Sequence, residues 1–298
     1  MYQLSETMQT AMAAGNPQRI LLEFTDPDTG TVTTMSNEEV SVTAGVSVYA
    51  PFNAEEELTF GLCPSAEVQF TLLNDERQLA DFRFGECAVW LGVRIDEGTP
   101  DASAKTATFR EGGRNALYEF APIGVYIVER PDVVQKDSIQ IRANDRMSKF
   151  DEEMPSQSDL GFSPMPSDGV SILQLLQALC TQAGVTLATT TFLNSDLTFT
   201  TWPKKYFDGR TMREVLKWIA EAAGSIARFN RQGELELVWF SDVNVSYTEG
   251  DYSEFTRAWY ETAAVDGLKV RNQSETSEST VGTGTDNNYV ISGNPFLS

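Results

Sequence analysis

Histidine is absent from this chain of 298 residues. Its absence excludes Ser-His-Asp and Cys-His hydrolases, histidine-ligated zinc sites and histidine general bases, because each of these needs an imidazole. Carboxylate-pair, lysine-based and thiol-only chemistry stay open. The sequence therefore favours a function other than catalysis, and we expect no catalytic residue, no metal site and no cofactor.

Cysteine is nearly as scarce, with three widely spaced residues, Cys63, Cys87 and Cys180. They form no C-x-x-C pair of the kind that binds metals or exchanges disulfides. Each lies among apolar residues, which predicts buried free thiols. The sequence leaves open whether Cys63 and Cys87 pair.

Basic residues are few: the chain has 22 Lys and Arg but 43 Asp and Glu, which gives a net charge of -21. This balance argues against binding a nucleic-acid backbone, which needs clustered cations, and against docking on an anionic membrane face. Colloidal solubility is the simplest interpretation of the acidic excess. The alternative is a surface that lines a passage through which a polyanion moves without adhering.

Long hydrophobic runs are also missing, because no stretch approaches the roughly 20 apolar residues of a membrane-spanning helix. The first residues carry neither a basic segment before Arg19 nor an apolar core, so they do not resemble a secretion signal. The sequence predicts a soluble protein, made in the cytoplasm, that does not insert into membranes.

The first 150 residues begin with one helix and then follow a β pattern. A helix is predicted over 5–14, with Ser5 as N-cap and a stop at 15–17, and we expect it to dock against a neighbouring domain or subunit. Short alternating runs with frequent turns follow, which favour a barrel or a sandwich. Strands are predicted at 20–24, 31–33, 40–42, 67–72, 87–95, 117–128 and 138–143. The polar stretch 96–115 predicts an exposed hairpin tip or mobile loop.

From residue 151 the pattern changes. The acidic, proline-interrupted stretch 151–169 predicts a linker. Helical spacing then predicts helices at 170–180 and 211–223 and a hairpin of 225–230 with 234–240. The first helix is expected to begin at Asp168 as N-cap and to end at Gly184.

A third unit is predicted after residue 243, with strands at 267–271 and 288–291 and a long loop or disordered excursion at 272–287. The end of the sequence predicts that this unit is incomplete and that the chain is the front part of a longer protein. The expected division is therefore 1–150 (helix plus β-barrel-like domain), 151–242 (α+β domain) and 243–298 (start of a second β-barrel-like domain).

Some residue groups could carry chemistry but are better explained as ordinary surface. The acidic runs Glu55–Glu57 and Asp151–Glu153 are typical of solvated charge. Glu234 and Glu236 lie two residues apart on one strand, as on any solvent-facing hairpin. The turn 26–30 lacks the length and distal glutamate of a calcium loop, and the glycine-rich 281–285 lacks the lysine of a phosphate-binding loop.

Three segments resemble the tail hub proteins of phages and prophages. Residues 211–240 fit the pattern T-x-R-E-V-L-x-x-I-A-E-x-A-G-x-x-A-R-x-N-R-x-G-x-L, and 124–147 resemble a strand pair that ends in A-x-D-R-M. Residues 289–297 are similar to Y-x-I-x-G-N-P-F-L, which in that family continues into more protein. The resemblance covers residues 120–298 well, and the first 120 only by their general β character.

The resemblance implies a mainly β fold with an α+β middle domain, in which β-barrel-like tube domains assemble as a homotrimer that continues the six-fold tail tube. It implies a virion tail tip or baseplate, reached from the host cytoplasm during assembly. The implied partners are the distal tail or tube protein, the tape-measure protein and receptor-binding or tail-fibre proteins, without sequence-specific nucleic-acid binding. Some family members end in a peptidoglycan hydrolase, but the front part carries no catalytic residues.

Two other functions stay open. One is a glycan- or receptor-binding β module of a tail tip, and the other is a carboxylate-based cell-wall hydrolase. A ring-forming trimer favours the hub, whereas a monomer with affinity for sugars favours the binding module.

Overall fold

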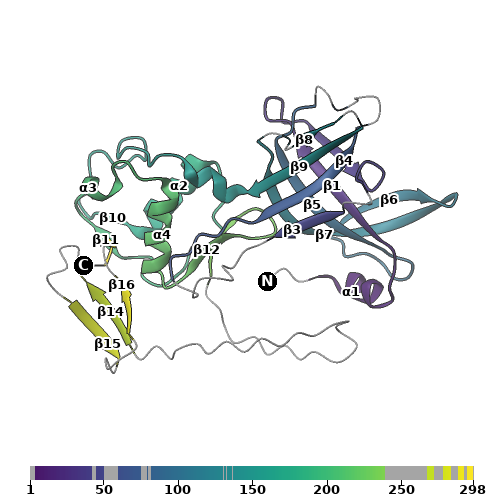
Figure 1. Ribbon diagram of the computed structural model, residues 1–298. Coiled ribbons are helices and arrows are strands. Elements are labelled where there is room, and N and C mark those ends of the chain that lie inside the picture. The colour runs from purple at the N-terminus through teal and green to yellow at the C-terminus, as the bar shows by residue number, and fades with distance from the viewer. Residues whose placement is uncertain are drawn as a thin grey trace.

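One antiparallel sheet occupies most of the first 145 residues of the computed structural model (Figure 1). The structure describes residues 4–41, 45–49, 60–74, 79, 82–129, 131, 133–135, 137–238, 267–271, 278–282, 288–291 and 294–297. The sheet consists of β1 (Gln18–Thr25), β2 (Val32–Ser36), β3 (Val46–Tyr49), β4 (Glu67–Leu73), β5 (Glu86–Arg94), β6 (Lys105–Glu111), β7 (Arg114–Ile127), β8 (Val133–Val134) and β9 (Ser138–Asp145).

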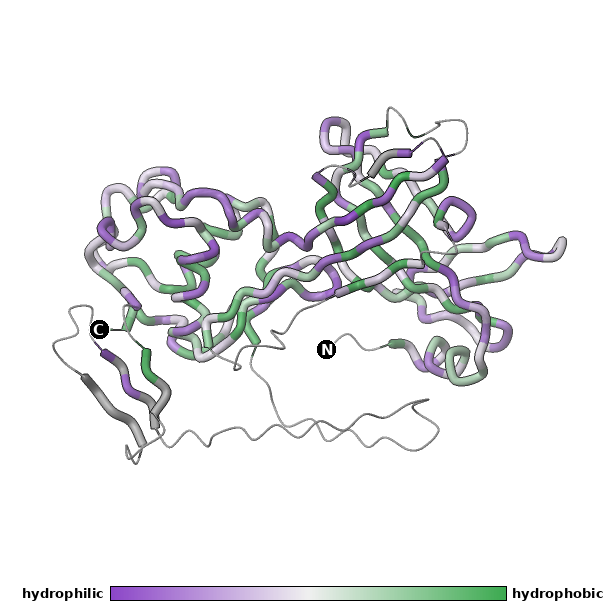
Figure 2. The backbone as a smooth tube through the Cα atoms, viewed as in Figure 1, coloured by the Kyte–Doolittle hydropathy of each residue, from purple (hydrophilic) through white to green (hydrophobic). Residues whose placement is uncertain are grey.

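The strand order is β2-β1-β5-β7-β9-β4-β3, with β6 added on β7 and β8 on β9. Within the described residues the edge strands β2 and β3 do not pair with each other, so the sheet is not closed into a barrel. Apolar and polar residues alternate along its strands, as Figure 2 shows, and β9 buries every second residue. The molecule is therefore mostly β with some helices, and the barrel stays a prediction.

Most of the strands expected from alternation are confirmed, and so is the turn at 26–30, where Gly30 N donates to Asp26 O. The strand expected at 40–42 is wrong in its described part, because Val40 forms only an isolated bridge with Leu72. Residue 42 lies outside the described residues.

The N-terminal helix is confirmed as α1 (Glu6–Ala13), and the hydroxyl of its N-cap Ser5 accepts from Met8 N. Met8 and Ala11 pack against Val93 and Ala121 of the sheet and against Ile95, which directly follows β5. Within the chain, the docking surface of α1 is therefore the sheet that follows it.

The polar stretch 96–115 is partly a strand, which corrects the expectation of a loop. β6 occupies Lys105–Glu111 and pairs with the first half of β7, and only Gly112 and Gly113 form the exposed tip that the sequence predicted. The apolar face of β6 consists of just Ala107 and Phe109, and the other residues of the strand are threonines and charged residues. The segment is therefore too polar for its alternation to predict a strand.

The helical part, residues 146–238, follows the sheet directly. Its elements are η2 (Arg146–Asp151), β10 (Val170–Ser171), α2 (Ile172–Ala183), β11 (Thr198–Phe199), α3 (Lys204–Phe207), α4 (Met212–Ala222), β12 (Ile226–Phe229) and β13 (Leu235–Val238). Both predicted helices and the predicted hairpin are confirmed as α2, α4 and β12–β13, while residues 239–240 lie outside the described residues.

The start of α2 differs from the expectation. Ser171 is the N-cap, not Asp168, because Val170 and Ser171 are extended in β10 and Gln174 completes a capping box with Ser171. The predicted stop is confirmed, since Gly184 has a left-handed φ of 63°.

The expected linker at 151–169 is irregular in structure but does not form a free tether. Met154 and Leu160 are buried in the same core as the apolar faces of α2 and α4. Cys63 also enters this core, and backbone hydrogen bonds join Gly61 N to Ser225 O and Ala227 N to Leu62 O. A segment from the sheet part thus completes the core of the helical part.

The last described strands are β14 (Gly267–Arg271), β15 (Glu278–Gly282) and β16 (Asn288–Ile291), where β14 is the central strand. The strands predicted at 267–271 and 288–291 are confirmed. The loop predicted at 272–287 is wrong over Glu278–Gly282, because Thr280 and Val281 are strong β formers that continue the sheet. The remaining residues of that loop lie outside the described residues.

Among the helices that the structure describes, none is long and apolar enough to span a bilayer.

Candidate functional site

Three of the carboxylates that the sequence singled out, those of Asp151, Glu234 and Glu236, form contacts with neighbouring side chains, while Glu152 and Glu153 are exposed. Glu236 accepts from Arg228 Nε at 2.8 Å across the β12–β13 pair, and Glu234 accepts from Asn230 Nδ2 at 3.0 Å in the turn. These are the contacts of a solvent-facing hairpin. Asp151 pairs with Arg213, and Glu55–Glu57 lie outside the described residues.

The turn at 26–30 is held by its own backbone. Asp26 Oδ1 accepts from the amides of Asp28 and Thr29 at 2.9 and 2.7 Å. Hydrogen bonds from Thr29 and Asp28 hold the pKa of Asp26 below its ordinary value. Over the described ranges, no group of three or more His, Cys, Asp or Glu side chains gathers as a metal ion would require.

All three cysteines are buried and free, as the sequence predicts, and Cys63 and Cys87 do not pair. Burial raises the pKa of both Cys63 and Cys180 to about 12, and it also raises the pKa of Cys87. These thiols are therefore protonated and unreactive at neutral pH. In the glycine-rich stretch, Val281 and Gly282 belong to β15, and 283–285 lie outside the described residues.

The structure instead brings together the three segments that carry the motifs. The first is the end of β9, where Asp145 is buried and caps η2. Its carboxylate accepts from Ser65 Oγ at 2.8 Å, Ala66 N at 2.9 Å and Met147 N at 3.0 Å. Burial raises the pKa of Asp145, although these three hydrogen bonds oppose the shift. Asp145, the acid of the A-x-D-R-M pattern, thus fixes where the chain leaves the sheet.

The next residue, Arg146, reaches the second segment. Its Nη1 donates to the carbonyl oxygen of Gly233 at 2.8 Å, and its Nε and Nη2 donate to Glu86 at 3.1 and 2.5 Å. Lys149 Nζ adds a third cationic contact to Glu86 at 3.0 Å. Residues of η2, β5 and the β12–β13 turn are therefore tied together by one carboxylate and one guanidinium.

Gly233 can approach this closely because it lacks a side chain. Its φ of 75° is left-handed, and a Cβ there would lie 2.8 Å from Val125 Cβ and 3.2 Å from Arg146 Nη1. The glycine of the N-R-x-G-x-L pattern thus serves both the turn and the contact with the sheet.

The third segment, at the end of the chain, lies on α4. Asn294 is fully buried, and its Nδ2 donates to Trp218 O at 2.9 Å and to Glu221 Oε2 at 2.8 Å. Its Oδ1 accepts from Phe296 N at 3.0 Å, which directs the Phe296 ring into the core of the helical part. We call these contacts of Asp145, Arg146, Gly233 and Asn294 the motif junction.

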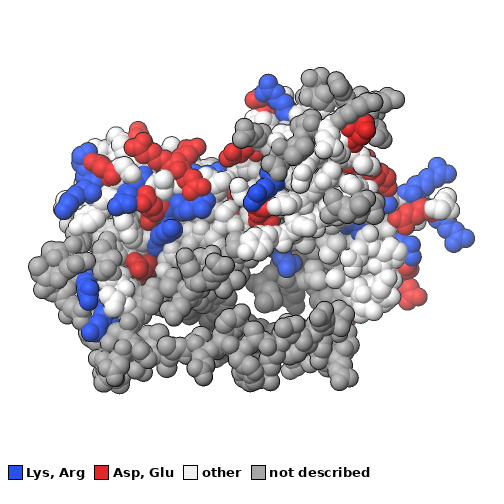
Figure 3. Space-filling view, viewed as in Figure 1, with Lys and Arg blue, Asp and Glu red and all other residues white. Residues whose placement is uncertain are grey.

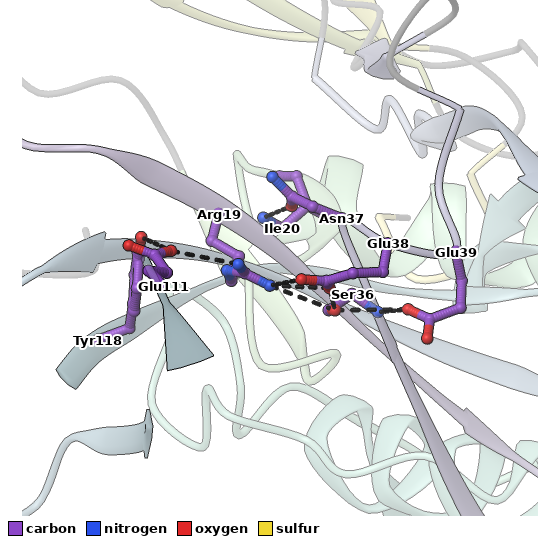
Figure 4. Close-up of polar contacts among 8 residues, drawn as sticks. All are labelled: Arg19, Ile20, Ser36, Asn37, Glu38, Glu39, Glu111 and Tyr118. Carbon is purple, nitrogen blue, oxygen red and sulfur yellow. Dashed lines mark hydrogen bonds and ion pairs between the residues drawn. The ribbon is translucent and has the colours of Figure 1, made fainter. Parts of the chain in front are cut away.

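Sequence reasoning missed a second polar network, which surrounds Arg19 (Figure 4). Arg19 is only 8% exposed and contacts both Glu38 oxygens at 2.8 Å and Glu111 Oε1 at 3.2 Å. Burial lowers the pKa of Arg19, but the hydrogen bonds with Glu38 and Glu111 outweigh it, so its pKa is raised. The sequence contained no clear signal, because alternation places Arg19 on the strand face of Glu23 and Thr25, opposite the apolar face of Ile20, Leu22 and Phe24.

No family model matches the sequence, and no curated protein matches it either. Among solved structures, the chain is similar to the crystal structure of the 43 kDa tail protein of prophage MuSo2 from Shewanella oneidensis. The two share 12% sequence identity with a TM-score of 0.45, over 92% of this chain and 71% of that chain.

Proposed function

We propose that this chain is a structural component of a phage-type tail, a baseplate hub or tail-tip protein that assembles as a homotrimeric ring. In this role it joins the tail tube to the tip, and DNA or the tape-measure protein passes through it. Its partners are the distal tail or tube protein, the tape-measure protein and receptor-binding or tail-fibre proteins. The chain itself is not an enzyme in this proposal.

The observation that carries the proposal is the motif junction. The three segments that resemble hub proteins lie far apart in sequence, yet Arg146 contacts Gly233 and Asn294 contacts Trp218 and Glu221. If the resemblance reflects a shared fold, the residues of the three motifs should contact one another in space. Chance similarities in separate segments would not be expected to do so. This supports the resemblance as a property of the fold.

The charge fits the same role. A lumen through which DNA passes must not bind it, and like charge prevents adhesion. The net charge of -21 supplies that repulsion if acidic side chains face the channel of the ring. A neutral or basic lumen would contradict this account of the charge but would leave the hub assignment in place.

The test is the mass and shape of the purified full chain. We expect a particle of three times the 33.0 kDa of one chain, seen as a ring by negative-stain electron microscopy. A monomer at micromolar concentration would contradict the hub proposal, and a monomer that also binds cell-wall glycans would favour the binding module instead.

The hydrolase alternative has its own test. Wild-type protein, Glu234→Gln and Glu236→Gln are incubated with purified peptidoglycan, and the release of soluble fragments is measured. We expect the same background release from all three. Release by the wild type that either variant abolishes would overturn the claim that the chain is not an enzyme.

A further inference from the structure

The hairpin of β6 and β7 projects from the sheet as an arm (Figure 1). Its strands pair from Lys105 opposite Phe120 to Glu111 opposite Arg114, and Gly112 and Gly113 form the tip. The helical part lies at the opposite end of the molecule (Figure 1). The base of the arm packs on the sheet, where Phe109 and Tyr118 join a small cluster with Leu21, and the largest core of the sheet contains no residue of β6.

The inner face of the arm is fixed to the sheet by the Arg19 network. The guanidinium of Arg19 lies 4.1 Å from the centre of the Phe109 ring, and Tyr118 Oη donates to Glu111 Oε1 at 2.7 Å. Glu111 also pairs with Arg94 at 3.5 Å. The Tyr118 hydrogen bond and the two arginines hold the pKa of Glu111 below its ordinary value, so this carboxylate is charged and directed inward.

The tip of the arm has the opposite character. Arg110 and Arg114 are exposed on either side of the two glycines, and neither forms an ion pair with any residue that the structure describes. Because Glu111 between them is engaged by Arg19 and Arg94, the tip presents uncompensated positive charge. Figure 3 shows Lys and Arg side chains at the projecting end of the arm, with acidic side chains beside them.

We propose that the tip of this arm, through Arg110 and Arg114, binds the acidic surface of a second copy of this chain. The argument is charge complementarity, because a chain with 43 acidic and 22 basic residues offers an anionic surface on every copy. A fixed arm that displays two arginines can contact that surface without losing the conformational entropy of a mobile loop.

The position of the arm favours a contact that closes a ring. A projection that contacts a different surface of the next copy forms a heterologous interface, and repetition of such a contact closes a ring when the rotation allows it. The inference thus rests on the proposed ring and names the element through which neighbouring copies recognise each other.

The test compares the full-length wild type with the double variant Arg110→Glu/Arg114→Glu. We expect the concentration for half-assembly to rise about tenfold or more, because each arginine is replaced by a charge that repels the acidic partner. The double variant Arg110→Lys/Arg114→Lys keeps the charge and is expected to assemble nearly as the wild type does. Sedimentation velocity at several concentrations and salt levels measures the effect, and added salt should weaken the wild-type assembly.

The matched control is Lys204→Glu/Lys205→Glu, which makes the same change in net charge at two exposed neighbours on α3. It should assemble as the wild type does. Circular dichroism and thermal melting of each variant establish that the chain is folded, which is expected because the tip side chains are exposed.

The outcomes separate this inference from the proposed function. A wild-type ring that the Arg110→Glu/Arg114→Glu variant also forms, at unchanged concentration, overturns the inference and leaves the hub proposal intact. Retention of a DNA duplex by the wild type, lost in that variant while its assembly is unchanged, also overturns it in favour of a nucleic-acid contact. A monomeric wild type overturns both.

Discussion

Arg146 and Glu86 form a bidentate ion pair where the sheet meets the helical part, with Nε and Nη2 at 3.1 and 2.5 Å from the two carboxylate oxygens. The remaining terminal nitrogen of the same guanidinium, Nη1, donates a hydrogen bond to Gly233 O. Fork-to-fork pairs of this kind are stronger and more directional than single contacts. Since both side chains are largely shielded from solvent, the pair fixes how the chain leaves the sheet.

We therefore expect Arg146→Ala to lower the free energy of unfolding by about 1–3 kcal/mol, because it leaves Glu86 and the Gly233 carbonyl without their main donor. Arg146→Lys should recover only part of this, since an ammonium cannot make the bidentate pair. Urea denaturation followed by circular dichroism measures both. Arg142→Ala is the control, because Arg142 pairs with Glu67 in an exposed position and its loss should cost under about 1 kcal/mol. Equal losses in Arg146→Ala and Arg142→Ala would show that the junction does not depend on Arg146.

The same pair predicts a pH dependence. Burial alone would raise the pKa of Glu86, but hydrogen bonds from Arg146 and Lys149 outweigh it and hold the pKa below its ordinary value. A carboxylate whose pKa is lowered on folding stabilises the protein at higher pH. That contribution is lost as the pH falls from the unfolded value of about 4.3 through the lower folded value.

We expect the melting temperature of the wild type to fall more steeply over this acid range than that of Glu86→Gln. The comparison cancels the titration of Asp145, whose raised pKa acts in the opposite direction in both proteins. Differential scanning calorimetry at a series of pH values measures the two slopes. Parallel curves would mean that the ion pair adds no stability of its own.

Local patterns in the sequence were enough for much of this fold. Helix α4 has its Thr211 cap, its glutamate at the third position and apolar residues on one face, so nothing distant is needed to predict it. The strands β14 and β16 were predicted to the residue. β6 was missed because only two of its inward-facing residues are apolar. These residues are covered by contacts with β7 and with Arg19, which the local sequence does not show. The N-cap of α2 was misplaced for a similar reason, since the pairing of β10 with β11 extends the chain past Asp168.

The candidate site was predictable only in part. The motifs named the right segments, but a resemblance does not say that Asn294 bonds to the carbonyl of Trp218 or that Arg146 bonds to that of Gly233. These are contacts of side chains with backbone atoms more than 70 residues away. Every residue has a backbone carbonyl, so the sequence does not indicate which one accepts the hydrogen bond. The tertiary contacts had to come from the structure.

The buried cysteines predict a simple chemical behaviour. Cys63, Cys87 and Cys180 are each at most 7% exposed, and burial raises their pKa values so that no thiolate forms near neutral pH. We expect a thiol reagent such as Ellman's reagent to label none of the three in native buffer and all three in denaturant. Fast labelling of one equivalent in native buffer would show that one of these sites opens. The single variants Cys63→Ala, Cys87→Ala and Cys180→Ala identify which cysteine is labelled.

The segment at 294–297 is expected to stabilise the helical part. The ring of Phe296 lies 5.7 Å from that of Phe199 and 6.1 Å from that of Phe207, measured between centroids, and it is buried among them. Phe296→Ala should therefore lower the free energy of unfolding by about 3 kcal/mol through lost burial and the cavity that remains. Asn294→Ala should cost about 1–3 kcal/mol, because it removes the donor to a buried carbonyl and to Glu221.

Glu221 links the second variant to pH. Burial raises the pKa of Glu221, and the hydrogen bond from Asn294 limits the rise. Without Asn294 the pKa of this carboxyl should rise further. The loss of stability in Asn294→Ala should therefore become smaller as the pH falls and Glu221 becomes protonated.

Val290→Ala, at an exposed position on the neighbouring β16, is the control and should change stability by no more than about 0.5 kcal/mol. If Phe296→Ala and Asn294→Ala resemble this control at every pH, the end of the chain rests on α4 without stabilising it, and the motif junction reduces to the contacts of Asp145, Arg146 and Gly233.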